Sequence, residues 1–440
     1  MRTAQDHIDL TRVGPGTVMG RFMRQYWVPA AKSSELARGG APIRLLLLGE
    51  KLIAFRDGQG RVGVMDHRCP HRCASLFLAR NEEAGLRCVY HGWKFDVNGQ
   101  CIDMPSVPPQ LDFKANVKAR AYRTAERAGL VWVYMGTRAE PPPLPAIEAT
   151  LLPEAELDVI FIQRACNWLQ SLEGDIDTSH VGFLHMGHVK PEDIPEGHYM
   201  EHTLTPRSPQ YHVSDTRWGT AYAAYRNVTI GGAEKTYWRF GHFMFPFWTQ
   251  FPQNALHDHL HARAWVPLDD EHTMTIYLRW KRTQPRREPL LGGVHLSPSH
   301  REEYLPNTSD WLGRFRVTAN ERNDWGLDRE AQSRNIIFTG IDSIYLQDQA
   351  VCESMGPITD HSHEHLGPGD LMVVRTRRRL LAEARKFAES GNAPPALEEP
   401  ESYLGARGGH FVAPAGIDWM AAYRDELSAA EGPAKGRRAW

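Results

Sequence analysis

The chain lacks several features that would assign it to a class at once. It has no run of about 18 apolar residues and no apolar core near its first residues, which argues against a membrane-spanning helix and a signal peptide. Its 51 basic and 53 acidic residues nearly cancel, and no long run of one sign favours nucleic acid or an anionic membrane as a partner. We therefore expect a soluble, cytoplasmic protein.

Cysteine is scarce and mostly without pattern. Two of the six cysteines in 440 residues stand in a motif, and the other four are scattered: Cys73, Cys101, Cys166 and Cys352. This spacing predicts reduced thiols rather than a disulfide framework. A nucleotide-binding motif is also missing, because the glycines at positions 14, 16 and 20 follow no predicted strand and indicate a plain turn. If this chain handles electrons, another protein must oxidise NAD(P)H.

The clearest motif is a pair of Cys-His segments in alternating order. Cys69 and His71 form the first segment, and Cys88 and His91 form the second after sixteen intervening residues. In a Rieske 2Fe-2S cluster two thiolates hold one iron and two neutral imidazoles hold the other, which raises the reduction potential above that of an all-cysteine cluster. The sequence therefore predicts such a cluster between two loops.

A structural zinc site is the alternative, because two cysteines and two histidines also form a common zinc ligand set. Zinc sites usually contain a cysteine pair followed by a histidine pair spaced for a helix. Here each segment supplies one residue of each type, and Asn98-Gly99 predicts a hairpin turn after the second segment. The local pattern favours the iron–sulfur cluster over zinc.

The chain divides into regions of different predicted structure. Short apolar runs between Gly, Pro and Asn turns predict a small all-β domain around the cluster loops. Proline-rich residues 141–145 predict a linker. We therefore predict an N-terminal segment 1–24, a cluster domain 25–140 and a second domain 150–440.

The second domain mixes strands with helices. Strands are predicted at 259–266 and 273–280, and helices are predicted near 167–181, 341–355 and 370–389, which indicates an α+β fold with an antiparallel sheet. The polar segment 283–307 predicts an exposed loop or lid. The last fifty residues predict loose order, apart from a short amphipathic stretch at 419–427.

A second metal site is suggested by polar side chains in the predicted helix 169–184. At 100° per residue, one stripe of this helix carries Gln170, Glu173, Asp177 and His180. His185 lies about 140° further round, so both imidazoles can bind one metal only if the helix distorts or ends near Gly182. Two histidines with ordinary partners at a helix end are the alternative.

A third ligand is predicted in the segment 341–355, which offers three carboxylates. Asp342 and Glu353 fall on the polar flank of the predicted helix, whereas Asp348 falls in the middle of its apolar stripe. A carboxylate among apolar side chains is costly unless it is paired or binds a metal. His180, His185 and Asp348 would then form the facial triad of a non-haem Fe(II) oxygenase, with open positions for O2 and substrate.

With these two motifs in order, the sequence resembles the α subunit of the Rieske non-haem iron aromatic ring-hydroxylating oxygenases over nearly its whole length. Residues 167–174 and 347–358 resemble the phthalate and phenoxybenzoate dioxygenase branch and its O-demethylase relatives. Many members of this family have Asn where this chain has Glu173. The resemblance implies a hydroxylase or O-demethylase that uses O2 on an aromatic, carboxylated compound.

The resemblance also implies an architecture and partners. The catalytic domain would have a helix-grip fold with a large antiparallel sheet, and subunits would form a homotrimer, or a dimer of trimers, arranged head to tail. Asp177 would then bridge the cluster of one subunit and His180 of the next, and a separate flavin and iron–sulfur reductase would supply electrons from NAD(P)H. The alternative function is a non-catalytic Rieske electron-transfer or ligand-binding protein, which has no use for Asp348 on an apolar stripe.

Further residues are candidates for substrate binding. The alternating aromatic segment 237–248 predicts core packing or a pocket wall. Arg226 and Arg239 interrupt apolar strands and could pair with a substrate carboxylate; surface-facing arginines are the alternative. Two histidine triplets look like metal sites, but no carboxylate or cysteine completes them: His257, His259 and His261 predict a sheet or pocket lining, and His361, His363 and His365 predict a solvated loop.

Overall fold

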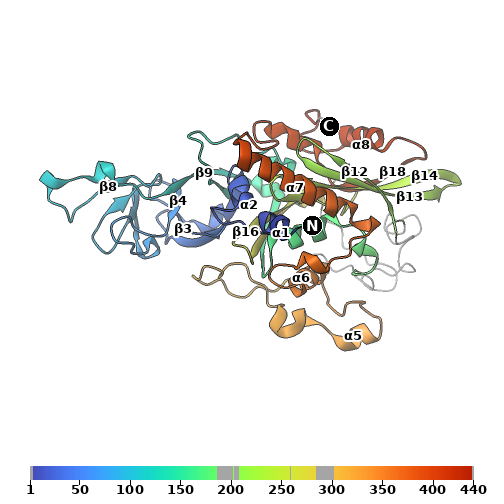
Figure 1. Cartoon of the computed structure of the whole chain (residues 1–440), viewed down its shortest axis with the longest axis horizontal. Helices are drawn as coiled ribbons and strands as arrows, with labels where there is room; N and C mark the ends of the chain where they lie inside the picture. The colour runs from blue at the N-terminus through green and yellow to red at the C-terminus, as the bar shows by residue number, and fades with distance from the viewer. Residues whose placement is uncertain (1–2, 186–201, 203–207, 258, 284–301, 439–440) are drawn as a thin grey trace.

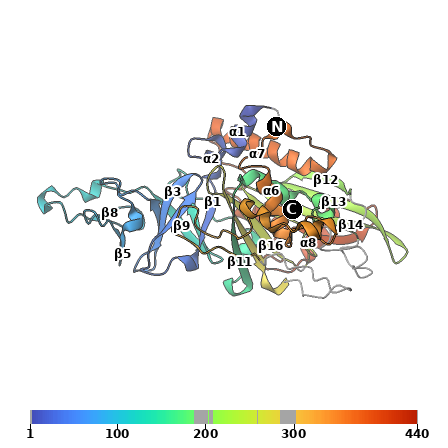
Figure 2. The ribbon, with the colours of Figure 1, turned by 90° about the horizontal axis from the view of Figure 1, so that it is seen from below.

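A computed structural model describes residues 3–185, 202, 208–257, 259–283 and 302–438. Figure 1 shows an elongated molecule with the cluster domain at one end and a larger domain at the other. In Figure 2 the strands of the cluster domain, including β5 and β8, again lie at the far end from both termini. No helix in the described part of the chain combines the length and the apolar character that a membrane crossing requires.

The cluster domain consists of two antiparallel sheets. The six-stranded sheet has the order β1-β10-β9-β4-β3-β2 and the four-stranded sheet has the order β5-β6-β7-β8. The first is built from β1 (Trp27–Lys32), β2 (Ile43–Leu47), β3 (Glu50–Arg56), β4 (Val62–Asp66), β9 (Ala121–Arg127) and β10 (Leu130–Tyr134). The second is built from β5 (Arg80–Glu82), β6 (Gly85–Arg87), β7 (Lys94–Phe95) and β8 (Cys101–Asp103). This arrangement confirms the small all-β domain.

The larger domain is organised around one eight-stranded sheet of antiparallel pairs. Its order is β11-β17-β16-β15-β14-β13-β12, and β18 pairs with β14. The strands are β11 (Leu157–Arg164), β12 (Gln210–Asp215), β13 (Gly219–Ile230), β14 (Ala233–Met244), β15 (Trp248–Gln250), β16 (His261–Pro267), β17 (Thr273–Trp280) and β18 (Gly409–Pro414). The predicted large antiparallel sheet is therefore confirmed, and β16 begins two residues later than expected.

Helices pack around this sheet. They are α1 (Ala4–Thr11), α2 (Val18–Met23), α3 (Trp168–Ile176), α5 (Arg329–Ser333), α6 (Ile344–Ser354), α7 (Leu371–Ser390) and α8 (Trp419–Ala429). The longest, α7, buries Met372, Val373, Leu380 and Ala384, which recur at helical spacing, against β12 and β13. The N-terminal helices α1 and α2 pack on α7. α7 ends where Gly391 takes a left-handed conformation with φ of 69°.

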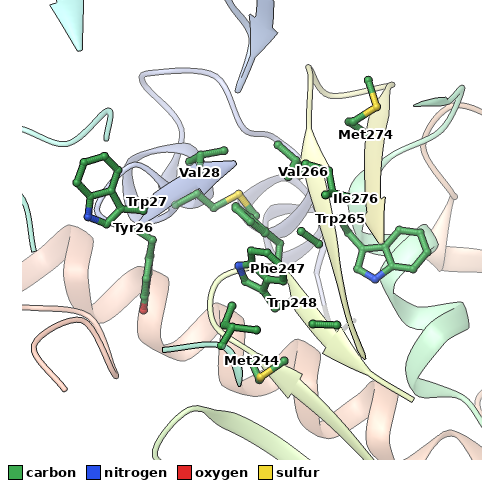
Figure 3. Packing of buried hydrophobic residues seen from close by; sticks show 14 of the residues in the cluster. Tyr26, Trp27, Val28, Met244, Phe247, Trp248, Trp265, Val266, Met274 and Ile276 are labelled. Atoms are coloured by element: carbon green, nitrogen blue, oxygen red, sulfur yellow. The ribbon is translucent and has the colours of Figure 1, made fainter. Parts of the chain in front are cut away.

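The two domains share one hydrophobic core. Val28 and Trp132 of the cluster domain belong to the same buried cluster as Trp248 and Trp265 of the large sheet. The Trp132 and Trp248 rings stack with their centroids 5.8 Å apart. Figure 3 shows side chains of both domains, among them Val28, Trp248 and Trp265, packed into one cluster. Residues 141–145 therefore pass between domains that are in extensive apolar contact.

The C-terminal region differs from the prediction. The last fifty residues are not loosely ordered, because β18 adds to the large sheet and α8 covers it. Phe411, Tyr423 and Leu427 are buried together with Phe240 of β14. These apolar residues are widely spaced in a polar sequence, so their common core is formed only by tertiary packing. The predicted lid at 283–307 lies largely outside the described residues.

Candidate metal centres

The two cluster loops are built alike. Cys69 donates its backbone N–H to Ala74 and Cys88 donates its own to Trp93, each five residues ahead. The carbonyl of each cysteine accepts an N–H from the residue four ahead, Cys73 or Gly92. Both of these residues have positive φ, 59° and 76°. The local hydrogen bonds thus give the two loops the same fold and turn each Cys-His pair toward the other loop.

The side chains of these loops fit a metal cluster. Cys69 and Cys88 are buried side by side, and burial raises the pKa of the Cys69 thiol to about 12. The His71 and His91 rings lie 4.3 Å apart, and Trp93 stacks on His71 at 4.2 Å. The buried Nδ1 of His91 has no hydrogen-bond partner among the described residues. Two facing thiols and an imidazole nitrogen without a partner suit a group that displaces the thiol protons.

The second site brings three predicted ligands together. Asp348 Oδ1 lies 3.6 Å from His180 Nε2 and 3.4 Å from His185 Nε2. One ligand atom of each side chain lies within 4.8 Å of the others. His180 comes from the turn after α3, His185 follows it closely, and Asp348 lies on α6. Two imidazoles and one carboxylate on one side leave the opposite side open, as the facial triad of a non-haem iron requires.

The outer nitrogen of each histidine has its own partner. His180 Nδ1 lies 3.4 Å from Asp177 Oδ2, and His185 Nδ1 lies 2.7 Å from Gln347 Oε1. Such contacts fix the ring orientation and leave the other nitrogen for a metal. Burial acts to raise the pKa of Asp177, but the hydrogen bond with His180 lowers it overall. Both Nε2 atoms are therefore directed at Asp348.

The helix prediction at this site was too long. α3 ends at Ile176, Asp177 caps it, and a short 3-10 turn spans His180–Gly182. The one-stripe arrangement of residues 170–180 is therefore wrong, because the last of them lie beyond the helix. Because the helix ends at Ile176, the following turn can direct both His180 and His185 toward one possible metal position. Gln170, within the helix, instead bonds the carbonyls of Cys352 and Gly356 and fastens α3 to α6.

The apolar stripe of α6 is only partly buried. Tyr345 and Cys352 are in the interior, but Val351 and Met355 are 37 % and 50 % exposed. Glu353 accepts hydrogen bonds from the Ala165 backbone and from other side chains, so its placement away from the triad was correct. Asp348 thus faces the site from the border between core and cavity.

A cavity of about 240 Å³ adjoins the triad, and we call it the iron-site cavity. Its walls include Asp177, His180 and Asp348, and its opening has an apolar rim of Val351, Met355 and Leu366. A volume of this size accommodates several water molecules. The cavity therefore connects the second metal position with the surface between α3, α6 and α7.

Sequence reasoning missed three arginines in the walls of this cavity. Arg164 is sandwiched between Trp265 and Tyr345, with its guanidinium carbon 4.8 Å from each ring. Arg263 forms a 2.6 Å ion pair with buried Asp175, and Arg377 binds two glutamates. Arg164 and Arg263 interrupt apolar strands as Arg226 and Arg239 do, so the same signal could have identified them.

Arg226 and Arg239 lie on the neighbouring strands β13 and β14 and are buried, with 5 % and 6 % exposure. The surface-facing alternative is therefore wrong. Arg239 Nε donates to Thr178 Oγ1 at 3.1 Å, which places this arginine directly behind the Asp177 to His180 turn. Burial, together with the charge of Arg239, lowers the pKa of Arg226 to about 10. Neither arginine is among the residues that line the iron-site cavity.

The remaining candidates separate into core and surface. Of residues 237–248, Tyr237 to Phe240 and Phe243 to Trp248 are largely buried in hydrophobic clusters, and none lines the iron-site cavity. His261 lies in β16, whereas His259 precedes the strand, so the first triplet does not share one strand face. In the second triplet His363 is exposed as expected, but His361 is buried. A solvated loop is therefore the wrong description of His361.

Known proteins match both halves of this chain. Residues 26–121 match the Rieske [2Fe-2S] domain family, and residues 133–428 match the family described as LigXa C-terminal domain like. The oxygenase subunit of 3-chlorobenzoate-3,4-dioxygenase from Comamonas testosteroni is 50 % identical over 97 % of this chain and 99 % of its own length. The chain belongs to the Rieske oxygenases. The first match also decides against zinc in the cluster loops.

Other similarities agree with this membership. The oxygenase subunit of phthalate 4,5-dioxygenase from Pseudomonas putida is 36 % identical over 89 % of this chain and 88 % of its own length. The crystal structure of dicamba monooxygenase has a TM-score of 0.55 at 15 % identity, covering 84 % of this chain and 99 % of that one, and shows a common fold. This Rieske oxygenase is an enzyme of a family that uses a 2Fe-2S cluster, mononuclear iron and O2, rather than a non-catalytic carrier or binding protein.

Proposed function

We propose that this protein is the terminal oxygenase component of a cytoplasmic system that hydroxylates or O-demethylates an aromatic carboxylate. The observation that carries the proposal is the convergence of His180, His185 and Asp348 in a chain that also has facing Cys-His loops. A separate flavin and iron–sulfur reductase would oxidise NAD(P)H, since the sequence shows no nucleotide-binding motif.

Each of the two proposed metal groups has its own set of candidate ligands. Cys69, Cys88, His71 and His91 would hold the 2Fe-2S cluster, and His180, His185 and Asp348 would hold Fe(II). The iron supplies open coordination positions for O2 and the electrons that activate it. The chain itself orients the imidazoles through Asp177 and Gln347. A ligand-binding protein would have no need for two histidines whose outer nitrogens are both fixed in this way.

The substrate carboxylate would bind Arg226 and Arg239. Both arginines are buried on neighbouring strands, and a guanidinium suits a carboxylate because it can donate two parallel hydrogen bonds to it. Arg239 contacts Thr178, the residue after Asp177, so this carboxylate site would lie behind the turn that carries His180 rather than in the lining of the iron-site cavity. The relatives named for 3-chlorobenzoate and phthalate act on carboxylated aromatics, which supports this substrate class.

Electrons would cross between subunits of a homotrimer, or of a dimer of trimers. The cluster loops expose Val89 and Tyr90, with Phe113 beside Trp93, and the iron-site cavity has its own apolar rim. Exposed apolar groups on two distant surfaces suit head-to-tail association. Asp177, which already contacts His180, lines the cavity and would accept a hydrogen bond from a cluster histidine of the next subunit.

Iron analysis and oxygen uptake test the proposal. The purified protein should contain about three irons per chain, two in the cluster and one at the triad. With a phthalate-type reductase and NADH, benzoate-type acids should stimulate O2 uptake, whereas the corresponding uncharged amides should not. Two irons per chain after reconstitution, or equal stimulation by acids and amides, would contradict it.

A further inference from the structure

A chain of titratable side chains leads from helix α1 to the iron-site cavity. His7 Nδ1 lies 2.8 Å from His361 Nδ1. His361 Nε2 is buried, forms no hydrogen bond among the described residues and faces Glu364 Oε1 at 3.6 Å, so a small side-chain rotation would close this link. Glu364 is in the cavity wall. His7 is half-buried and His361 is 7 % exposed. These contacts join residues more than 350 positions apart in the sequence and run from the outer surface to the interior.

The geometry of His361 suits the transfer of protons. Each ring nitrogen faces a different partner, so the imidazole can take a proton on one side and release it on the other without turning. The contact between the two Nδ1 atoms can hold one proton, because two N–H groups would repel and two bare nitrogens would not bond. Asp360 and Arg12 are charged groups beside His7, and Arg377 and Glu364 act on both His7 and His361. Glu173 also lies close to His361.

The inner end of the chain is a cluster of two carboxylates around one guanidinium. Arg377 Nη2 donates to Glu173 Oε2 at 2.6 Å and to Glu364 Oε1 at 2.8 Å, and Nη1 donates to Glu364 Oε2 at 2.6 Å. Two carboxylates and one guanidinium carry a net charge of about −1 when both acids are ionised. Burial raises the pKa of Glu173. Burial also acts to raise the pKa of Glu364, but its hydrogen bonds with Arg377 lower it overall, so Glu173 is the carboxylate that holds a proton more readily. The cluster can therefore accept a proton beside the cavity.

A metal ion is a poor alternative occupant of this cluster. Glu173, His361 and Glu364 do have ligand atoms within 4.8 Å of one another. However, Arg377 already binds both carboxylates, and its charge disfavours a cation between them. Arg377 already supplies the positive charge that offsets Glu173 and Glu364. The His361 imidazole therefore remains available for proton exchange.

The reaction consumes protons whichever product forms. For an aromatic substrate R, dihydroxylation follows R + O2 + 2e⁻ + 2H⁺ → R(OH)2. For a substrate RH, monohydroxylation follows RH + O2 + 2e⁻ + 2H⁺ → ROH + H2O. In the proposed trimer, the cluster loops of the next subunit cover the rim of the iron-site cavity. Bulk water would then be excluded from that side, and the two protons would have to pass through the cavity wall.

We propose that His7, His361 and Glu364 form a proton relay that supplies the iron-site cavity from the face of α1. Protons enter at His7, pass through His361 to Glu364, and cross the cavity on water molecules. The inference rests on the proposed function, because it requires a covered cavity that consumes protons. His7 and His361 lie outside the cavity lining, Glu364 lies in it, and none of the three is a proposed iron ligand.

The test compares His361→Ala with His363→Ala, an exposed neighbour in the same short turn. We expect His361→Ala to slow coupled product formation on the order of tenfold at alkaline pH, where protons are scarce. Added imidazole should restore the rate, at a concentration that leaves the wild type unchanged. Anaerobic reduction of the cluster, which needs no such relay, should be equal in all three proteins. Glu364→Gln, which keeps a partner for Arg377, should slow turnover without rescue.

A second readout does not depend on activity. Burial, followed by the charge of Arg377, lowers the pKa of His361 to about 4 from its ordinary 6.5. Between these values the unfolded chain binds a proton that the folded chain does not, so stability falls as pH drops from 6.5 toward 4. His361→Ala should flatten this part of the melting-temperature profile, and His363→Ala should not.

Two outcomes would overturn the relay in distinguishable ways. An active wild type whose His361→Ala variant keeps its rate at every pH would contradict the relay alone. A wild type that is monomeric, or that shows no substrate-dependent O2 uptake with any aromatic acid, would contradict the proposed function and remove the reason for a relay.

Discussion

The two metal centres are built on opposite principles. The proposed ligands of the cluster lie within residues 69–91, and each loop is closed by its own backbone hydrogen bonds. The proposed ligands of the iron site come from the segment after α3 and from α6, which are more than 160 residues apart, and the two histidines are aligned by Asp177 and Gln347. A local site depends on its turns, whereas a dispersed site depends on the packing of whole helices.

Loss of a cluster ligand should have the largest effect and should remain local. Cys88→Ser removes a thiolate ligand, so we expect the cluster to be lost and O2 uptake to be abolished, while about one iron per chain stays at the triad. Visible and electron paramagnetic resonance spectra with iron analysis measure both. Cys73→Ser, an exposed cysteine of the other loop, should keep the cluster. Loss of the triad iron in Cys88→Ser would show that the sites are not independent.

Asp177 is the residue that we propose connects the two metal centres. We expect Asp177→Asn to keep both metals but to slow electron transfer from the cluster to iron by about 100-fold or more, because the carboxylate would bridge two histidines. Stopped-flow reoxidation of the reduced cluster in the presence of O2 and substrate measures this rate. Reoxidation near the wild-type rate would refute the bridge.

The dispersed site should be sensitive to a residue outside its ligand set. Gln347→Leu removes the acceptor for His185 Nδ1 and should weaken iron binding by roughly 10- to 100-fold. Gln347→Glu, which still accepts this hydrogen bond, should retain iron. Iron-binding titrations of the two variants make the comparison, and equal affinity in both would show that packing alone orients His185.

The smallest effect on activity is expected from substitution of the two arginines proposed to bind the substrate. Arg239→Ala and Arg226→Ala should raise KM for a benzoate-type acid by about tenfold with little change in kcat, since each removes a charge-assisted pair. Arg217→Ala, an exposed arginine in the connection between β12 and β13, is the matched control. Unchanged kinetics in both buried-arginine variants would exclude this carboxylate site.

The same contrast explains what the sequence could predict. The cluster motif and strands such as β16 and β17 depend on neighbouring residues, so spacing and turn residues identified them. Asp348 was found because a charge in an apolar stripe needs a partner. The end of α3 could not be located, since Gln170 and Glu173 are held by Cys352, Gly356 and Arg377, far away in the chain. Buried His361 and strand β18 likewise depend on distant segments, as does Arg164. Domain bounds of 25–140 and 150–440 and the individual ligand roles stay predictions.

The core that the two domains share has a consequence for how electrons travel. Trp132 and Trp248 stack within one apolar interior, so the cluster domain is anchored rather than carried on a flexible tether. A tethered carrier transfers electrons by moving between docking positions, so its electron-transfer rate falls as the viscosity of the solvent rises. In the proposed trimer the donor would stay in place, and its distance to the acceptor would be set when subunits assemble. We therefore expect transfer to iron to be insensitive to added glycerol or sucrose and to be lost on dilution to monomers.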